Sequence, residues 1–264
     1  MSRAACRILV KLGGTLLDTP ELRDRLAAQI AAARGEIVVV HGGGKQMTRY
    51  LTERGIESRF VNGLRVTTPE TVDALLKVFA GSVNHELVAS LNRAGARAVG
   101  LSGIDAFLAE AEQMDPALGA VGRVVRANPA LLELLTGAGY LPVVACVAGD
   151  RQGSVYNVNA DQMAVACAVA FRATQLVFLT DVEGVLDAEK RVRPQLTAAE
   201  SEALISSGVA TGGMLAKLRA ALTALEGGVS EVRIAPGTAP GVVERVLAGE
   251  ALGTRMVLSE VHAA

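Results

Sequence analysis

The sequence predicts an α/β fold: a three-layer sandwich with a mainly parallel central sheet and helices on both faces, in which any second lobe shares the sheet. Apolar, β-branched runs such as Arg7–Leu12 and Glu36–His41 are nearly continuous, as in parallel strands buried on both faces. Segments with apolar residues at helical spacing separate these runs, which places helices on both faces of the sheet. No linker divides the 264 residues, so a second lobe must share the same sheet.

Helices are expected where apolar residues recur every three or four positions. Pro20–Arg34 has this spacing, with Thr19 and Pro20 as start signals. The longest helical segment, Pro69–Arg93, contains Gly81, where we expect a bend or a close packing point. The other expected helices are Lys45–Arg54, Asn128–Ala138, Ala160–Phe171, Thr197–Ser206, Gly213–Gly227 and Gly241–Leu247.

Further strands are expected where short β-branched or apolar runs lie between turn residues. They are Arg97–Leu101, Phe107–Glu112, Val121–Val125, Leu141–Ala148, Gln175–Thr180, Glu231–Ala235 and Thr254–Leu258.

Composition argues against several classes of protein. The 26 Lys and Arg balance 27 Asp and Glu, so the chain lacks the positive charge that nucleic acids and anionic membranes attract. Trp is absent, and apolar runs fall short of the roughly 20 residues of a membrane span. Cys6, Cys146 and Cys167 form no metal-binding or disulfide pattern, and the last two are expected to be buried. We expect a cytoplasmic protein without a nucleic-acid partner, a membrane partner or a metal site of its own.

Glycines follow the first two expected strands directly. Gly13-Gly14 comes after Leu12, and Gly42-Gly43-Gly44 lies between a strand and a helix. Ligands of open α/β sheets bind at the carboxyl ends of strands, where glycine lets backbone N–H groups approach an anion. The glycine pair could equally be an ordinary turn, whereas the triple glycine is more specific. Neither a P-loop nor a GxGxxG motif is present.

Three basic residues are candidates for binding an anion. Lys11 lies inside an apolar strand, where its charge needs an anion or carboxylate unless its stem reaches the sheet edge. Lys217 lies on a helix and by itself could be solvated. Arg65, in NGLRVT, could bind a carboxylate through two hydrogen bonds or form a surface ion pair.

The stretch YNVNADQ, residues 156–162, is the most unusual in the chain. Asn157, Asn159 and Asp161 alternate immediately before or at the start of a helix. Asp161 could cap that helix. Alternatively, the two amides and the carboxylate could orient a polar ligand and nearby lysines.

Taken together, these motifs resemble the amino-acid kinase superfamily, and within it the branch that phosphorylates N-acetyl-L-glutamate in arginine biosynthesis. The matching segments span nearly the whole chain in the family's order. They are VKLGGTLL (10–17), VVVHGGGKQ (38–46), FVNGLRVT (60–67), GLSGID (100–105), YLPVVA (140–145), VYNVNADQ (155–162), LTDVEGVLD (179–187), TGGMLAKLRAAL (211–222) and GTRM (253–256).

The resemblance implies ATP-dependent phosphorylation of the side-chain carboxylate of N-acetyl-L-glutamate. It implies catalytic roles for Lys11 and Lys217, which would stabilise the transferring phosphoryl group, and for Asp161, which would hold both lysines. It implies acetylglutamate contacts at Gly43, Gly44, Arg65 and Asn157, with Arg65 on the α-carboxylate. It implies phosphate or ATP contacts at Gly14, Asp181, Val182, Gly184, Val185, Leu186, Val209, Ala210 and Thr211.

The resemblance also implies a division of labour and an assembly. Residues 1–174 would form an N-terminal lobe for acetylglutamate binding and dimerisation, and residues 175–264 a C-terminal lobe for ATP. Mg²⁺ would arrive with the nucleotide. Because only about six residues precede the first strand, we expect a plain homodimer without arginine feedback, its contact formed by Pro69–Arg93 crossing its twin.

Three alternatives remain open. A sibling kinase could act on N-succinylglutamate or on carrier-linked aminoadipate or glutamate. A non-catalytic, ligand-binding member of the fold is the third, although it should have lost Lys11, Asp161 or Lys217. The stretch Phe107–Gly122 and Ala106, where many relatives have glycine, lie in the expected substrate lobe.

Overall fold

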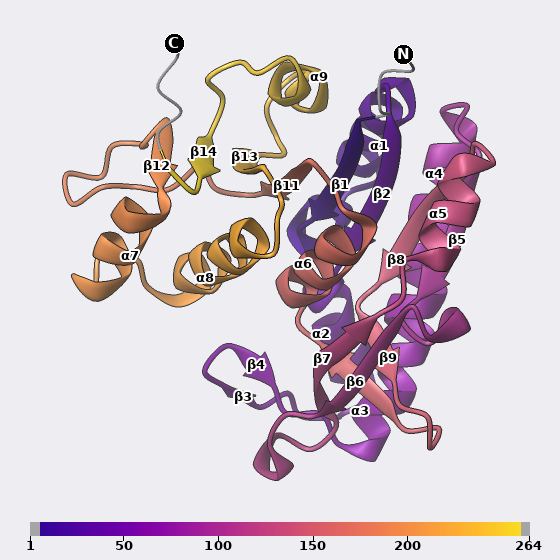
Figure 1. Ribbon diagram of the computed structural model, residues 1–264. Coiled ribbons are helices and arrows are strands. Elements are labelled where there is room, and N and C mark those ends of the chain that lie inside the picture. The colour runs from indigo at the N-terminus through magenta and orange to yellow at the C-terminus, as the bar shows by residue number, and fades with distance from the viewer. Residues whose placement is uncertain (1–5, 260–264) are drawn as a thin grey trace.

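The computed structural model describes residues 6–259 and contains a central sheet of eight strands (Figure 1). Neighbouring strands pair in parallel, except that β14 runs antiparallel to β13. In spatial order the strands are β12 (Gln195–Thr197), β14 (Thr254–Val257), β13 (Glu231–Pro236), β11 (Gln175–Thr180), β1 (Arg7–Leu12), β2 (Glu36–His41), β8 (Leu141–Ala145) and β5 (Ala98–Ser102). The expected fold class is therefore confirmed.

Helices pack on both faces of this sheet. On one face α1 packs against α4 and α9, and on the other α6 packs against α8. The side chains of Lys11 and His41 lie on opposite faces of the sheet, because Lys11 contacts α6 whereas His41 contacts α4. The helices are α1 (Pro20–Ala32), α2 (Gly44–Glu53), α3 (Pro69–Leu75), α4 (Asn84–Arg93), α5 (Ala130–Gly137), α6 (Ala160–Phe171), α7 (Ala198–Ser206), α8 (Gly212–Glu226) and α9 (Val242–Leu247).

The long segment expected as one helix is helical throughout but changes its winding. Between α3 and α4, residues Leu76–Val83 form a π-helix that contains Gly81. The expected irregularity is therefore a wider turn rather than a break. Such π segments often lie at functional sites.

A small closed barrel branches off the sheet, and the sequence pattern did not predict it. Its strands are β6 (Ala109–Gln113), β7 (Val121–Ala127), β9 (Val147–Gly149) and β10 (Val155–Val158). The expectation of one strand over Leu141–Ala148 was wrong, because the chain leaves the central sheet at Cys146 and enters the barrel as β9. Ala106, at the position where glycine is expected in relatives, has φ +50°, which glycine adopts more easily.

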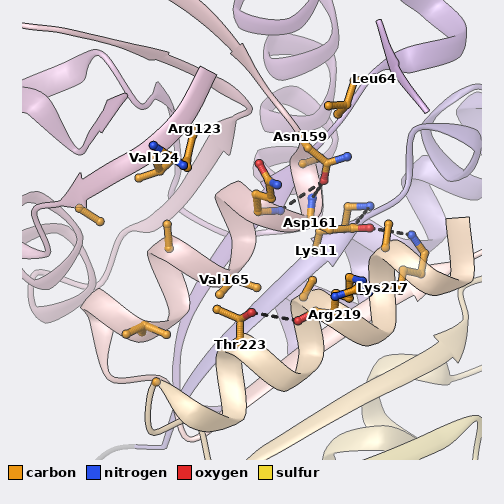
Figure 2. A pocket seen from close by; sticks show the side chains of 18 of the residues that line it. Lys11, Leu64, Arg123, Val124, Asn159, Asp161, Val165, Lys217, Arg219 and Thr223 are labelled. Carbon is orange, nitrogen blue, oxygen red and sulfur yellow. Dashed lines mark hydrogen bonds and ion pairs between the residues drawn. The ribbon is translucent and has the colours of Figure 1, made fainter. Parts of the chain in front are cut away.

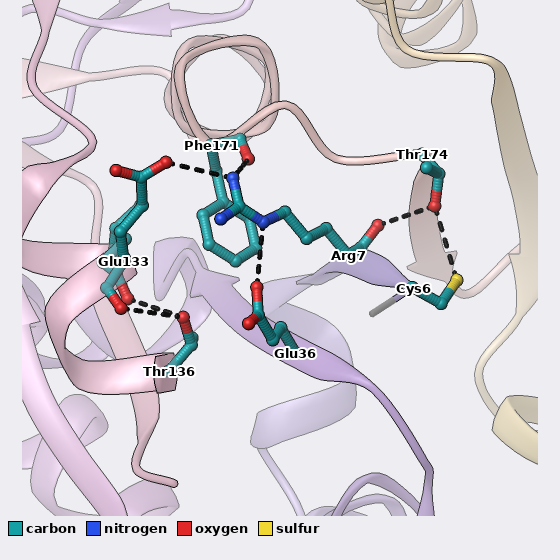
Figure 3. A network of polar contacts seen from close by, with 8 residues as sticks. Cys6, Arg7, Glu36, Glu133, Thr136, Phe171 and Thr174 are labelled. Atoms are coloured by element: carbon teal, nitrogen blue, oxygen red, sulfur yellow. Dashed lines mark hydrogen bonds and ion pairs between the residues drawn. The ribbon is translucent and has the colours of Figure 1, made fainter. Parts of the chain in front are cut away.

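The amino ends of the strands are tied together by Arg7 (Figure 3). Its guanidinium lies 2.8 Å from a Glu36 carboxylate oxygen and 3.0 Å from one of Glu133, and it donates to the Phe171 carbonyl at 2.9 Å. This network joins β1, β2, α5 and α6. The carboxyl ends of the strands, at the opposite edge, carry the glycine loops.

Two of the three cysteines lie where the sequence predicts them. Cys146 and Cys167 are buried, as expected, and burial raises the pKa of each thiol to about 12. No helix within residues 6–259 has the length and apolar character needed to cross a membrane.

Candidate active site

Two lysines from different elements converge on one carboxylate. Lys11 Nζ, on β1, lies 2.6 Å from Asp161 Oδ1, and Lys217 Nζ, on α8, lies 2.9 Å from Oδ2 (Figure 2). All three side chains are at least four-fifths buried. One negative charge therefore holds two positive charges at the carboxyl edge of the sheet, which leaves the cluster with net charge +1.

The pKa values of the triad follow from burial and from the neighbouring charges. Burial lowers the pKa of Lys11, which the nearby Lys217 lowers further, while Asp161 opposes the change. Burial alone would raise the pKa of Asp161, but the two lysines together hold it below its ordinary value. Asp161 therefore stays ionised at neutral pH and keeps both ammonium groups in place.

The local sequence explains why Asp161 is free to bind lysines. Asn159, and not Asp161, caps α6, because its Oδ1 accepts from the backbone N–H groups of Asp161 at 2.9 Å and Gln162 at 3.3 Å. Of the two roles that the sequence left open for Asp161, the structure supports the orientation of lysines.

The two glycine loops touch beside the triad. A Cβ atom on Gly14 would lie 3.0 Å from the amide nitrogen of Gly44 and 3.3 Å from that of Gly43. Because Gly14 has no side chain, the amides of Gly43 and Gly44 can lie this close to the first loop. The α2 helix begins at Gly44, so its positive end faces the same space.

A cavity of about 860 Å³ brings the triad lysines and both loops together. Of the sequence-predicted residues, it is lined by Lys11, Gly14, Gly44, Arg65, Asp181, Val182 and Lys217. Backbone amides, two lysines and an arginine suit a highly negative ligand, such as a nucleotide polyphosphate together with a carboxylate.

Arg65 lines this cavity, and its guanidinium is held by several contacts. Its Nη2 donates to Thr48 Oγ1 at 2.7 Å and to the Gly44 carbonyl at 3.2 Å, while Nη1 donates to Ser58 Oγ. The guanidinium carbon lies 4.6 Å from the centre of the Phe60 ring. Burial lowers the pKa of Arg65, but an arginine stays charged in any ordinary buffer.

Other sequence-predicted residues lie apart from this cavity's lining. Gly43 packs its backbone against Phe79, and Asn157 donates from Nδ2 to Thr67 Oγ1 at 3.0 Å. The side chains of Val185 and Ala210 are buried, whereas Leu186 and Val209 are exposed. Thr211 precedes α8, and Gly184 has φ +156°. Their roles in binding stay predictions.

Several residues that line the cavity were given no site role by the sequence analysis. They are Thr15, Lys45, Thr48, Arg49, Phe60, Thr180, Gly213 and Met214. Most lie within a recognised motif, so their position could have been found from it. Ser58 and Thr48 could not, because their role depends on the fold bringing them to Arg65.

A second cavity, of about 1090 Å³, is lined by residues of α6, α8 and β7 (Figure 2). Val124, Val165 and Thr223 are among its lining residues, and it shares Lys11 and Lys217 with the first cavity. The two triad lysines therefore border both cavities.

The buried lysines beside the glycine loops form a site suited to a phosphotransferase, and the sequence comparison agrees. The amino-acid kinase family matches residues 7–236, and the chain belongs to this family. It is 74% identical over 254 residues to the acetylglutamate kinase of Solibacter usitatus, covering 95% of this chain and 99% of that protein. It is 46% identical over 247 residues to that of Rubrobacter xylanophilus, covering 94% and 95%. The resemblance inferred from the motifs is confirmed.

Solved structures with lower sequence identity share the fold. N-acetylglutamate synthase from Neisseria gonorrhoeae, complexed with coenzyme A and N-acetyl-glutamate, superposes with a TM-score of 0.86 at 24% identity. The match covers 98% of this chain and 61% of the synthase chain. Carbamate kinase from Giardia lamblia, bound to AMP-PNP, superposes with a TM-score of 0.74 at 16% identity, covering 97% and 99%.

The contact between the glycine loops yields a first prediction. Gly14→Ala should lower kcat by at least about tenfold with the fold retained, because its Cβ would push the Gly43 and Gly44 amides away. Steady-state kinetics and thermal unfolding measure the two effects. Gly137→Ala is the matched control: it lies in α5, nothing lies within 4 Å of its added Cβ, and activity should not change. Full activity of Gly14→Ala would contradict the proposed importance of this contact.

Proposed function

We propose that this protein phosphorylates the side-chain carboxylate of N-acetyl-L-glutamate with ATP, the activity of an acetylglutamate kinase. The single observation that carries the mechanism is the pair of lysines held by Asp161 beside two glycine loops. The 74% identity to a protein of that name supports the choice of substrate.

Transfer to a carboxylate joins two strongly negative groups. The acceptor oxygen attacks the γ-phosphorus, the bond from phosphorus to the β,γ-bridging oxygen breaks, and ADP leaves with that electron pair. The acceptor is ionised at neutral pH, so the reaction needs no general base. What it needs is in-line positioning and positive charge around the transferring group.

Each part of the site suits one of these needs. Lys11 and Lys217 would neutralise charge on the phosphoryl oxygens, and Asp161 would keep both lysines in place without touching the substrate. The amides of Gly14 and Gly44 would donate to phosphoryl oxygens. Because the lysines are largely buried, water screens their charge little. Each lysine would therefore stabilise the transferring phosphoryl group more than a lysine at the surface would.

The nucleotide and its metal would occupy the same cavity. Asp181 and Val182 line it at the end of β11, and the remaining C-lobe positions of the motif would surround the nucleoside. Within residues 6–259, no three His, Cys, Asp or Glu side chains cluster as metal ligands. We assign Mg²⁺ to the nucleotide phosphates, where it would neutralise charge.

We also propose which ligand each lobe binds and how two copies of the chain assemble. Residues 1–174 would bind acetylglutamate and form a homodimer through Pro69–Arg93, and residues 175–264 would bind ATP. Size-exclusion chromatography with light scattering, with and without arginine, tests the assembly. A dimer unaffected by arginine is expected, and a monomer or an arginine-sensitive larger ring would contradict the proposal.

Hydroxylamine trapping tests the reaction and the substrate together. The protein is incubated with MgATP, hydroxylamine and one acid at a time: N-acetyl-L-glutamate, N-succinyl-L-glutamate, L-glutamate, L-aspartate or carrier-linked aminoadipate. Acyl hydroxamate is expected with N-acetyl-L-glutamate. Signal with another acid alone would keep the phosphotransferase and change its substrate. No signal from folded, ATP-binding protein would favour a non-catalytic member of the fold.

Arg65 yields a second prediction. Arg65→Ala should raise the KM for N-acetyl-L-glutamate about 10- to 100-fold, because a charge-assisted hydrogen-bond pair to the α-carboxylate is lost. The KM for ATP should change little. Arg59→Ala, which removes an exposed arginine that does not line the cavity, is the matched control. An unchanged KM for the acid in Arg65→Ala would remove Arg65 from substrate binding.

A further inference from the structure

We infer that His41 and Asn84 are positioning residues that fix the peptide between Gly42 and Gly43 and thereby hold the Gly43 N–H at the contact between the two glycine loops. The inference rests on the proposed function for its kinetic consequence, but its structural part stands alone. Neither residue lines the cavity of about 860 Å³ that contains both glycine loops, so both would act only through the backbone of the triple-glycine loop.

The hydrogen bonds determine which nitrogen of His41 carries its proton. Asn84 Nδ2 lies 2.9 Å from the Val143 carbonyl oxygen and 2.9 Å from His41 Nε2. A carbonyl oxygen can only accept, so the Asn84 atom must be the NH₂ group, and it must donate to His41 as well. His41 Nε2 therefore carries no proton. The ring proton lies on Nδ1 and is donated to the Gly42 carbonyl at 2.9 Å.

Burial keeps His41 in this state. His41 and Asn84 are almost fully inaccessible to solvent, and burial lowers the pKa of His41 to about 4. A neutral imidazole at pH 7 cannot switch between donor and acceptor while Asn84 holds Nε2. His41 therefore acts as a fixed donor to Gly42 and not as an acid or base.

Holding the Gly42 carbonyl also fixes the next amide. The Gly42 C=O and the Gly43 N–H belong to one planar trans peptide, so they point in opposite directions. The Gly43 nitrogen lies 3.3 Å from the position of a Cβ on Gly14, at the contact between the two loops. A rotation of this peptide would move the N–H away from that contact.

The π-helix supports the same loop from a second direction. A Cβ on Gly43 would lie 2.8 Å from Cδ1 of Phe79 and 3.4 Å from Cγ2 of Val83. Phe79 and Val83 lie in the π-helix, and Asn84 follows it directly. The π-helix thus places two apolar side chains against Gly43, and the residue that follows it places an amide against the ring of His41.

Two substitutions at His41 separate positioning from packing. His41→Leu fills similar space but donates no hydrogen bond, whereas His41→Asn places an amide N–H near the position of Nδ1. Rates are divided by the concentration of folded sites, which is measured by nucleotide binding. His41→Leu should then lower kcat/KM for N-acetyl-L-glutamate about 10- to 100-fold. His41→Asn should recover most of this loss, and the KM for ATP should change little in either variant. Equal losses in both variants, or near-normal values for a folded His41→Leu, would overturn the inference.

Nuclear magnetic resonance tests the structural part without any turnover. The chain has three histidines, so ¹⁵N-histidine spectra of wild type and His41→Asn identify the His41 signals. A neutral ring protonated at Nδ1 is expected at pH 7, and a ring protonated at Nε2 would overturn the inference. The Gly43 amide resonance should move in His41→Leu and return towards its wild-type position in His41→Asn. If these results hold and wild type makes no acyl hydroxamate, the positioning stands and the proposed function fails.

Discussion

Lys217→Ala is expected to lower kcat by about a hundredfold or more, the effect of removing one preorganised charge from a transition state. The KM for N-acetyl-L-glutamate should change far less, because Lys217 would act on the transferring phosphoryl group. Its partner Asp161 stays paired with Lys11, and Lys217 is the most exposed of the three, so the variant should fold. Steady-state kinetics with circular dichroism as a folding check measures the outcome.

Arg219→Ala is the matched control for this prediction. Arg219 lies on the same helix two residues further on and is exposed. It lines the second cavity and not the one that contains the glycine loops. Its replacement should leave kcat unchanged. Near-normal turnover by folded Lys217→Ala would contradict the two-lysine mechanism.

Asp161→Asn is expected to affect both activity and stability. Without the carboxylate, two buried ammonium groups face each other without compensation, and the free energy of unfolding should fall by about 3 kcal/mol. kcat should also fall by at least about a hundredfold, because the lysines lose both their position and their stable protonation. Denaturant unfolding and steady-state kinetics measure the two effects. Glu112→Gln is the control, since its ion pair with Arg123 is exposed and should contribute about 0–1 kcal/mol.

The same substitution changes the pH dependence of stability. The pKa of Asp161 in the folded protein lies below its ordinary value, so its stabilisation is present above pH of about 4, the value in the unfolded chain. It is lost as the pH falls through the lowered value. Wild type should therefore lose stability on acidification more steeply than Asp161→Asn. Parallel curves of unfolding free energy between pH 7 and pH 3 would show that Asp161 is not ionised and paired as described.

Most strands of the central sheet could be predicted because local composition determines them, although the short β12 (Gln195–Thr197) was not. Arg7–Leu12, Glu36–His41 and Gln175–Thr180 have the expected bounds, since a strand buried on both faces must be apolar nearly throughout. The barrel could not be predicted, because its strands are defined by partners distant in the chain, such as β6 with β9. The passage of the chain from the central sheet into the barrel at Cys146 could not be predicted either, because it falls within one continuous apolar run.

The residues of the candidate site differ in how far their roles could be predicted from the sequence. Lys11 could be found because a charge in a buried strand requires a partner, and that partner is Asp161. Lys217 could be assigned only through the family motif, since nothing local distinguishes it from a solvated helix lysine. The roles of Asn159 and His41 depend on hydrogen-bond geometry, which one sequence pattern does not determine.

Binding of a transition-state mimic tests the central claim most directly. ADP, Mg²⁺ and fluoroaluminate imitate the planar transferring phosphoryl group in the presence of N-acetyl-L-glutamate. Calorimetry should show that Lys217→Ala binds this assembly about a hundredfold more weakly than wild type, while its affinity for N-acetyl-L-glutamate alone changes little. Equal weakening of both affinities, or no weakening of either, would contradict the claim that the Asp161-held lysines stabilise the transferring phosphoryl group.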